Sequence, residues 1–185
     1  MRIIAPPEAL RAARALLGVS QRDVADQAGV PQRSLSIVEN SDYLLADTNL
    51  LLVDFYTAKG LVFLGEGFIG SEIARCGACW AAPENPGKPE STEPQFQTLD
   101  VSVSFKAARA FLNRERADIA DSAGLTVAAV RGLEAGKKWT ESYQKLVEFY
   151  ESEGIEFTGW GEPSTQKFYG VGVRWKGERR VSTRS

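Results

Sequence analysis

Apolar side chains recur every three or four residues in several short segments, a spacing typical of amphipathic helices. The first such segment, residues 6–17, predicts a helix that ends at Gly18. Ser20 is a good N-cap for a second helix over residues 21–28, because its hydroxyl can accept from the first free amides of that helix. The residues of the second helix expected to face the core are Val24, Ala25 and Ala28.

Gly29 follows at the point where the chain must turn sharply, a position that often needs positive φ. Pro31 lies at or beside the first position of a third helix, which would bury Leu35 and Val38. A fourth helix is predicted over residues 47–59, capped by Asp47 or Thr48 and stopped by Gly60. That helix is apolar almost all round, so part of it should meet a second surface.

Two short strands are predicted after this helix, at residues 61–64 and around 77–80, joined as a hairpin. The composition then shifts to Pro, Glu and Thr, which predicts an extended linker over residues 81–100. Helical periodicity returns at Ser102, a candidate cap. These changes divide the chain into an N-terminal domain (1–80), the linker, a C-terminal domain (101–176) and a basic tail (177–185).

The second domain repeats the first, with an offset of 95 residues. The segment A-A-R-A at residues 12–15 returns at 107–110, and Gly29 and Glu39 return as Gly124 and Glu134. After one deletion, V-D-F-Y-T-A-K-G matches V-E-F-Y-E-S-E-G, and Trp80 matches Trp175. Because glycine, tryptophan and charged positions match as well as alanines, chance similarity between alanine-rich helices is a poor explanation.

Composition excludes several functional classes. The 185 residues include no histidine, which removes imidazole-based acid-base catalysis and most zinc sites. The net charge of −2 and pI near 5.4 mean that any basic surface must be local. No apolar run approaches a membrane span or a secretory signal, so we expect a cytoplasmic protein that is not an enzyme and needs no cofactor.

The repeated unit resembles the helix-turn-helix regulators of the phage repressor and Cro type (XRE family). The residues that carry the resemblance are L-x-x-A-R, then S-Q-x-x-V-A-x-x-A-G-V, then L-x-x-V-E four residues later. The resemblance implies a mainly α protein of two tandem helix-turn-helix domains, each with four to five short helices and a small β-hairpin at its end. It also implies that Arg14 pairs with Glu39, and Arg109 with Glu134, in internal salt bridges.

The family's roles fall on the first repeat as follows. The third helix would enter the major groove of double-stranded DNA, where Gln32 and Arg33 would face base edges. Gln21, with Ser20 beside it, would contact a phosphate, and Ser34 and Ser36 a phosphate or a base. The alternative for Gln32 and Arg33 is an ordinary solvated helix face.

The second repeat departs from the family pattern. It has Val127, Ala128 and Ala129 in place of Gln32, Arg33 and Ser34, and such a helix can touch thymine methyl groups but cannot read donor and acceptor patterns. Between residues 106 and 138 seven basic residues face four acids, so this repeat could grip phosphates without reading bases. The expected phosphate contacts are Arg116, Arg131, Lys137 and Lys138. The alternative is an ordinary mixed surface.

Two further features remain open. Cys76 and Cys79 have metal-ligand spacing, but the chain offers no other Cys or His, so two reduced thiols near a strand are expected rather than a metal site. Leu50 and Leu51 are replaced by Gln144 and Lys145 in the second repeat, which suggests a contact between lobes or a homodimer.

The pattern as a whole predicts a sequence-specific DNA-binding transcriptional regulator of bacterial or phage type, associated with the nucleoid when bound. The first repeat would read bases and the second would mainly position the protein. A rival hypothesis is an antiactivator or assembly factor that uses the same fold to bind a partner regulatory protein. The acidic pI and the apolar third helix of repeat two favour this rival.

Overall fold

The computed structural model describes residues 4–43, 45–66, 73–83, 96–138, 140–163 and 165–177. These residues form eight helices and one four-stranded antiparallel sheet, so the fold is mixed α/β, with more sheet than the sequence predicted. The elements of the first repeat are α1 (Pro7–Leu17), α2 (Gln21–Ala28), α3 (Gln32–Asn40), α4 (Ala46–Ala58), β1 (Leu61–Glu66) and β2 (Ala74–Trp80). Those of the second are α5 (Phe105–Leu112), α6 (Arg116–Ser122), α7 (Val127–Glu134), α8 (Thr140–Ser152), β3 (Ile155–Glu162) and β4 (Lys167–Trp175).

Local signals place the first three helices where the sequence predicted them. The Ser20 hydroxyl accepts from the amide of Asp23, and the Asp23 carboxylate accepts from the amide of Ser20, which completes a capping box at the start of α2. Gly29 ends α2 in the left-handed region with φ of 66°, a conformation that most other residues avoid. Pro31 is the N-cap of α3, and Leu35 and Val38 are buried.

Two predicted caps are wrong. The N-cap of α4 is Leu45, without a side-chain hydrogen bond, because the helix begins before Asp47 and Thr48. The N-cap of α5 is Ser104, whose hydroxyl accepts from the amide of Ala107, rather than Ser102. Ser102 instead hydrogen-bonds the Tyr143 hydroxyl at 3.0 Å.

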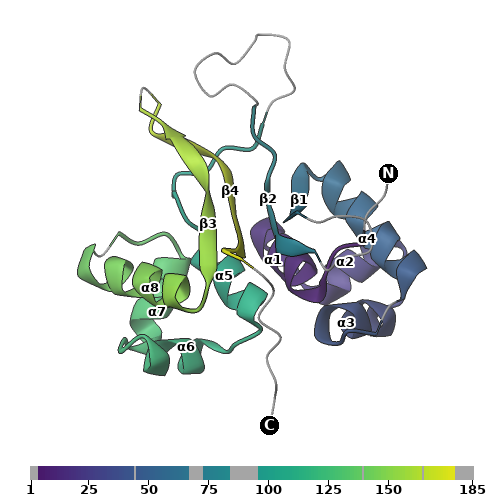
Figure 1. The fold of residues 1–185 in the computed structure, drawn as a ribbon, viewed down its shortest axis with the longest axis horizontal. Coiled ribbons are helices and arrows are strands. Elements are labelled where there is room, and N and C mark those ends of the chain that lie inside the picture. Colours follow the sequence, from purple (N-terminus) through teal and green to yellow (C-terminus); the bar gives the residue numbers. More distant parts are fainter. Residues whose placement is uncertain are drawn as a thin grey trace.

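The two hairpins join into a single sheet, with strand order β1-β2-β4-β3 (Figure 1). At its centre β2 and β4 pair antiparallel, with Gly77 opposite Arg174, Ala78 opposite Val173 and Cys79 opposite Gly172. The repeat offset of 95 relates Gly77 to Gly172 and Cys79 to Arg174, so it converts the Gly77–Arg174 pair into the Gly172–Cys79 pair. The same offset relates Ala78 to Val173, the two members of the middle pair. An approximate two-fold axis therefore passes through the Ala78–Val173 pair and relates the two repeats.

Glycine permits the close approach of β2 and β4. A Cβ atom at Gly77 would lie 2.1 Å from the Val173 carbonyl oxygen, and one at Gly172 would lie 2.2 Å from the Ala78 carbonyl oxygen. The two glycines occupy equivalent positions in the repeats, so the same constraint operates on both sides of the axis. Neither position can hold a side chain without separating the strands.

Helices α1 and α5 pack against each other beneath the sheet, between the two outer groups of helices (Figure 1). Both helices bury several alanines, whose small side chains permit a close approach. Arg11 of α1 adds hydrogen bonds across it, donating from Nε to the Ala110 carbonyl at 2.9 Å and from a terminal nitrogen to the Phe111 carbonyl at 3.0 Å. The buried apolar side chains of both repeats belong to one continuous core.

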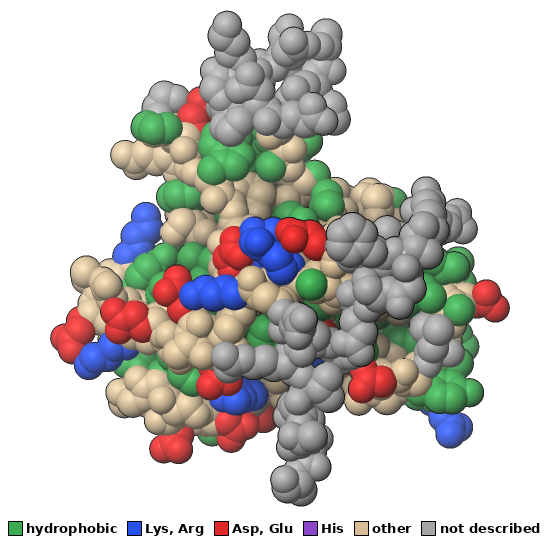
Figure 2. Space-filling model, viewed as in Figure 1, with side chains coloured by type: hydrophobic (Ala, Val, Ile, Leu, Met, Phe, Trp, Pro, Cys, Tyr) green, Lys and Arg blue, Asp and Glu red, His purple; other side chains and the backbone are tan. Residues whose placement is uncertain are grey.

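The face of the sheet away from α1 carries ion pairs that cross the repeat boundary. Glu156 of β3 accepts from Arg174 of β4 at 2.7 Å and from Arg75 of β2 at 2.9 Å. Figure 2 shows this gathering of basic and acidic side chains in front of the strands. The two repeats are thus joined both by the backbone hydrogen bonds of β2 and β4 and by the side-chain pair of Arg75 and Glu156.

Part of the predicted linker is attached to the sheet. Leu99 and Phe168 exchange two backbone hydrogen bonds of 2.9 Å each, as an isolated bridge beside β4. Residues 84–95 of the linker and residues 178–185 of the basic tail lie outside the described residues. Among the helices that are described, none is both long enough and apolar enough to cross a bilayer.

We expect Gly77→Ala and Gly172→Ala each to lower the free energy of unfolding by about 3 kcal/mol, because the added methyl group collides with backbone that only strand separation could move. Urea denaturation would measure the loss. Gly177→Ala is the control, because a Cβ there meets no atom within 4 Å and the stability should stay unchanged. Equal stability of Gly77→Ala and Gly177→Ala would contradict the close approach.

Candidate nucleic-acid interface

Two helix pairs, α2–α3 and α6–α7, carry the predicted contact residues. The approximate two-fold axis relates them, and they lie on opposite flanks of the central α1–α5 pair (Figure 1). Both stand toward the end of the molecule opposite the tip of the β3–β4 hairpin. The two sets of predicted contact residues therefore belong to one framework that shares a sheet and a core.

A buried glutamate locks each helix pair. Glu39, at 1% exposure, accepts from Arg14 Nε at 2.8 Å and from Arg14 Nη2 at 2.9 Å, which confirms the predicted internal salt bridge. Glu134 pairs in the same way with Arg109, with contacts of 2.5 and 3.3 Å. Although burial alone would lower the pKa of Arg14 and Arg109, the hydrogen bond and charge of the paired glutamate raise it overall.

The residues at the start of α2 and α6 also donate hydrogen bonds to these glutamates. The Gln21 amide donates to Glu39 at 2.7 Å, and Arg116 donates to Glu134 at 2.6 Å. Sequence reasoning assigned both residues to phosphates and missed these internal partners. The signal was available, because positions 21 and 116 are equivalent in the repeat and both hold hydrogen-bond donors one helix away from an equivalent glutamate.

The predicted base-reading residues lie in the open. Gln32 and Arg33 are exposed in the first turn of α3, Ser34 and Ser36 are half-buried, and Ser20 is exposed but engaged in the capping box. The first turn of α3 contains no acidic residue, so the Arg33 charge is not neutralised locally. The hydrogen-bonding surface of this turn is available to an outside partner.

The equivalent turn of α7 presents a different surface. Val127 is 48% exposed at the position that matches Gln32, and Ala128 is exposed beside it. The Thr126 hydroxyl caps the helix by accepting from the Ala129 amide at 3.1 Å. One helix pair therefore offers polar groups at its tip and the other offers methyl groups.

The basic residues predicted to grip phosphates do not form one cluster. Arg131, Lys137 and Lys138 are exposed, whereas Arg116 is bound to Glu134.

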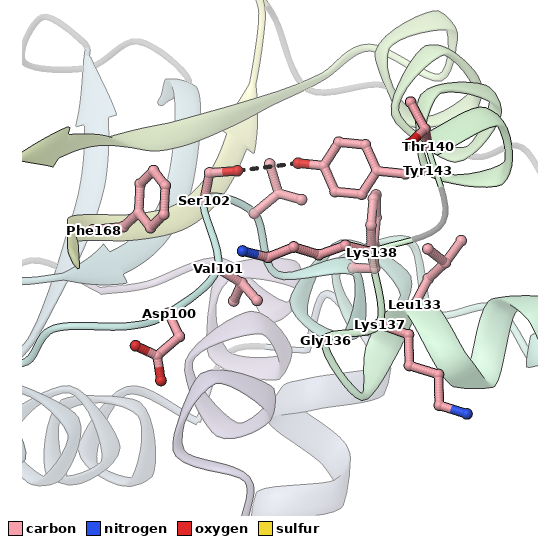
Figure 3. A pocket seen from close by; sticks show the side chains of 12 residues that line it. Asp100, Val101, Ser102, Leu133, Gly136, Lys137, Lys138, Thr140, Tyr143 and Phe168 are labelled. Atoms are coloured by element: carbon pink, nitrogen blue, oxygen red, sulfur yellow. Dashed lines mark hydrogen bonds between the residues drawn. The ribbon is translucent and has the colours of Figure 1, made fainter. Parts of the chain in front are cut away.

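Lys137 and Lys138 lie at a cleft of about 270 Å³ between residues 100–103 and the turn that joins α7 to α8. Figure 3 shows Lys138 extending across this cleft toward Val101 and Ser102, while Lys137 points away from it. The hydrogen bond and the charge of Lys167 lower the pKa of Asp100, and the charge of Lys138 adds a smaller effect in the same direction.

The two cysteines are free thiols on β2, both buried. Burial raises the pKa of Cys79 to about 11, so its thiol is uncharged and poorly nucleophilic at neutral pH. Cys76 donates to Glu8 at 3.5 Å on the side of the strand that faces α1. Within the described part of the chain no group of three Cys, Asp or Glu residues could hold a metal ion.

Comparison of the chain with protein-family models, curated proteins and solved structures finds no match to any of the three. The residues themselves therefore carry the functional argument.

We expect Glu39→Gln to lower the free energy of unfolding by about 3 kcal/mol, because it leaves the largely buried charge of Arg14 without its counterion. Glu134→Gln should have a similar effect in the second repeat. Asp26→Asn is the control, since the exposed Arg22–Asp26 pair at 4.0 Å contributes little. Urea denaturation of the three variants would check this; a Glu39→Gln variant no less stable than Asp26→Asn would show that the buried pair is not a lock.

Proposed function

We propose that this chain is a sequence-specific DNA-binding transcriptional regulator of the phage-repressor type, in which one chain supplies both halves of a dimer-like reader. The observation that carries the proposal is the approximate two-fold relation between the α2–α3 and α6–α7 pairs. Regulators that bind DNA with paired helix-turn-helix units use this symmetry to address two successive major grooves. Here β2–β4 and α1–α5 replace the interface between two subunits.

The two halves contribute differently. In the first, the exposed Gln32 and Arg33 suit adenine and guanine edges respectively. In the second, Val127 and Ala128 offer only apolar contact, and Arg131 and Lys137 supply positive charge. The expected DNA site is therefore asymmetric, with one half read by hydrogen bonds and the other held by its backbone and by thymine methyl groups.

One observation favours a rival function, in which the second helix pair binds a regulatory protein. Val127 is among the most exposed large hydrophobic side chains of the described residues, and it stands at the tip of α7. Exposed apolar side chains are typical of protein contacts, whereas a DNA interface is strongly basic. The rival function would place the antiactivator or assembly role on α7.

We expect Arg33→Ala to weaken binding to the preferred duplex by about 1 to 3 kcal/mol and to relax the base preference at one position. The preferred duplex would first be selected from a randomised library. Arg131→Ala should instead weaken binding to all sequences alike and reduce the salt dependence by about one counterion. Fluorescence anisotropy over a salt series would separate the two effects.

The same experiment tests the assignment of the reader. Sequence preference that survives both Gln32→Ala and Arg33→Ala would show that α3 does not read bases. No DNA binding at low salt, together with a stable complex with another protein that Val127→Lys abolishes, would establish the rival function in its place.

A further inference from the structure

We propose that an exposed ridge on α4 joins two copies of this chain in an antiparallel helix pair. The ridge consists of Asp47, Leu51, Phe55 and the C-cap residue Lys59, at intervals of four residues. Side chains at this spacing form a continuous row on a helix surface, and such rows interlock when two helices pack. The proposal concerns contact between chains, so it does not depend on what the helix pairs bind.

The middle of the ridge is apolar and accessible. Leu51 is 49% exposed, and Phe55 is half-buried with its ring 5.2 Å from that of Tyr56. The Lys59 ammonium lies over the Phe55 ring, 5.5 Å from its centroid. Leu50 is half-buried beside the ridge, so the homodimer contact predicted for Leu50 and Leu51 rests mainly on Leu51.

The two ends of the ridge carry opposite charges. Asp47 and Lys59 are both exposed. Neither takes part in an ion pair among the described residues, and the Lys59 ammonium contacts only the Phe55 ring. When two copies of α4 run antiparallel about a point near Val53, Asp47 of each copy meets Lys59 of the other, and Leu51 meets Phe55. The ridge is thus complementary to itself in charge and in hydrophobicity, as a two-fold interface requires.

The second repeat provides an internal comparison. The equivalent ridge on α8 is Glu141, Lys145, Phe149 and Glu153. Its charges are satisfied within the chain, because Lys145 pairs with Glu141 at 2.8 Å and Glu153 with Arg114 at 2.7 Å. At equivalent positions, α8 therefore forms ion pairs within its own repeat, whereas α4 has an apolar middle and charged ends that form no ion pair among the described residues.

The contrast extends beyond the ridge. Of the large hydrophobic side chains that are exposed among the described residues, three lie in the first repeat (Tyr43, Leu51 and Val62) and one, Val127, lies in the second. A helix face that contacts only water could carry ion-paired side chains, as α8 does. The exposed Leu51 indicates a partner, and the opposite charges of Asp47 and Lys59 at the two ends of the ridge favour a second copy of this chain as that partner.

Analytical ultracentrifugation of the full chain over a concentration series tests the proposal. The wild-type chain should approach twice its 20.2 kDa mass at high concentration. Leu51→Lys introduces the residue found in the second repeat and should raise the dissociation constant about 30-fold or more, as expected for a side chain at the centre of an interface. Lys145→Glu on α8 is the matched control and should leave the dissociation constant unchanged.

A charge exchange tests the antiparallel arrangement. Asp47→Lys and Lys59→Asp should each weaken the dimer, and the double variant should restore it, because the opposite charges meet again with their signs reversed. Circular dichroism would confirm that each variant is folded. A wild-type chain that stays monomeric, a dimer insensitive to Leu51→Lys, or a double variant no better than the single ones would each overturn the proposal; so would a monomer that binds a different protein through this ridge.

Discussion

The structure depends on the close approach of the two repeats at their approximate two-fold axis. Gly77 and Gly172 bring β2 and β4 within hydrogen-bonding distance, and the alanines of α1 and α5 bring the helices together beneath them. Small residues at one axis thus create a single sheet and a single core from two similar halves. Every other element takes its place relative to this contact.

Much of the fold within each repeat could be predicted from the sequence, because its signals are local. The Ser20 cap, the left-handed Gly29 and the helical spacing of buried residues fix α1 to α3 almost to the residue. The joining of the hairpins could not be predicted in the same way, since β2 and β4 lie far apart along the chain and neither carries a signal for its partner. The equivalent glycines show their meaning only once the strands are paired.

The candidate site was predicted in part for a similar reason. The exposure of Gln32 and Arg33 follows from helical spacing, because the neighbouring Leu35 and Val38 must turn inward. The hydrogen bonds of Gln21 and Arg116 to the buried glutamates depend on how the first three helices of each repeat meet, which spacing along one helix does not reveal. These two residues stabilise the helix pairs from inside, so any role toward a ligand uses only the donors that remain.

Joining the repeats in one polypeptide changes how the occupancy of a target depends on protein concentration. Two separate subunits must find each other before they present paired helices, so a dimeric reader occupies its target with a steep dependence on the amount of protein. In this chain the second helix pair is always present at a high effective concentration relative to the first. Engagement of a paired target should therefore rise gradually with protein level, and the fused framework stays assembled even when only a few molecules are present.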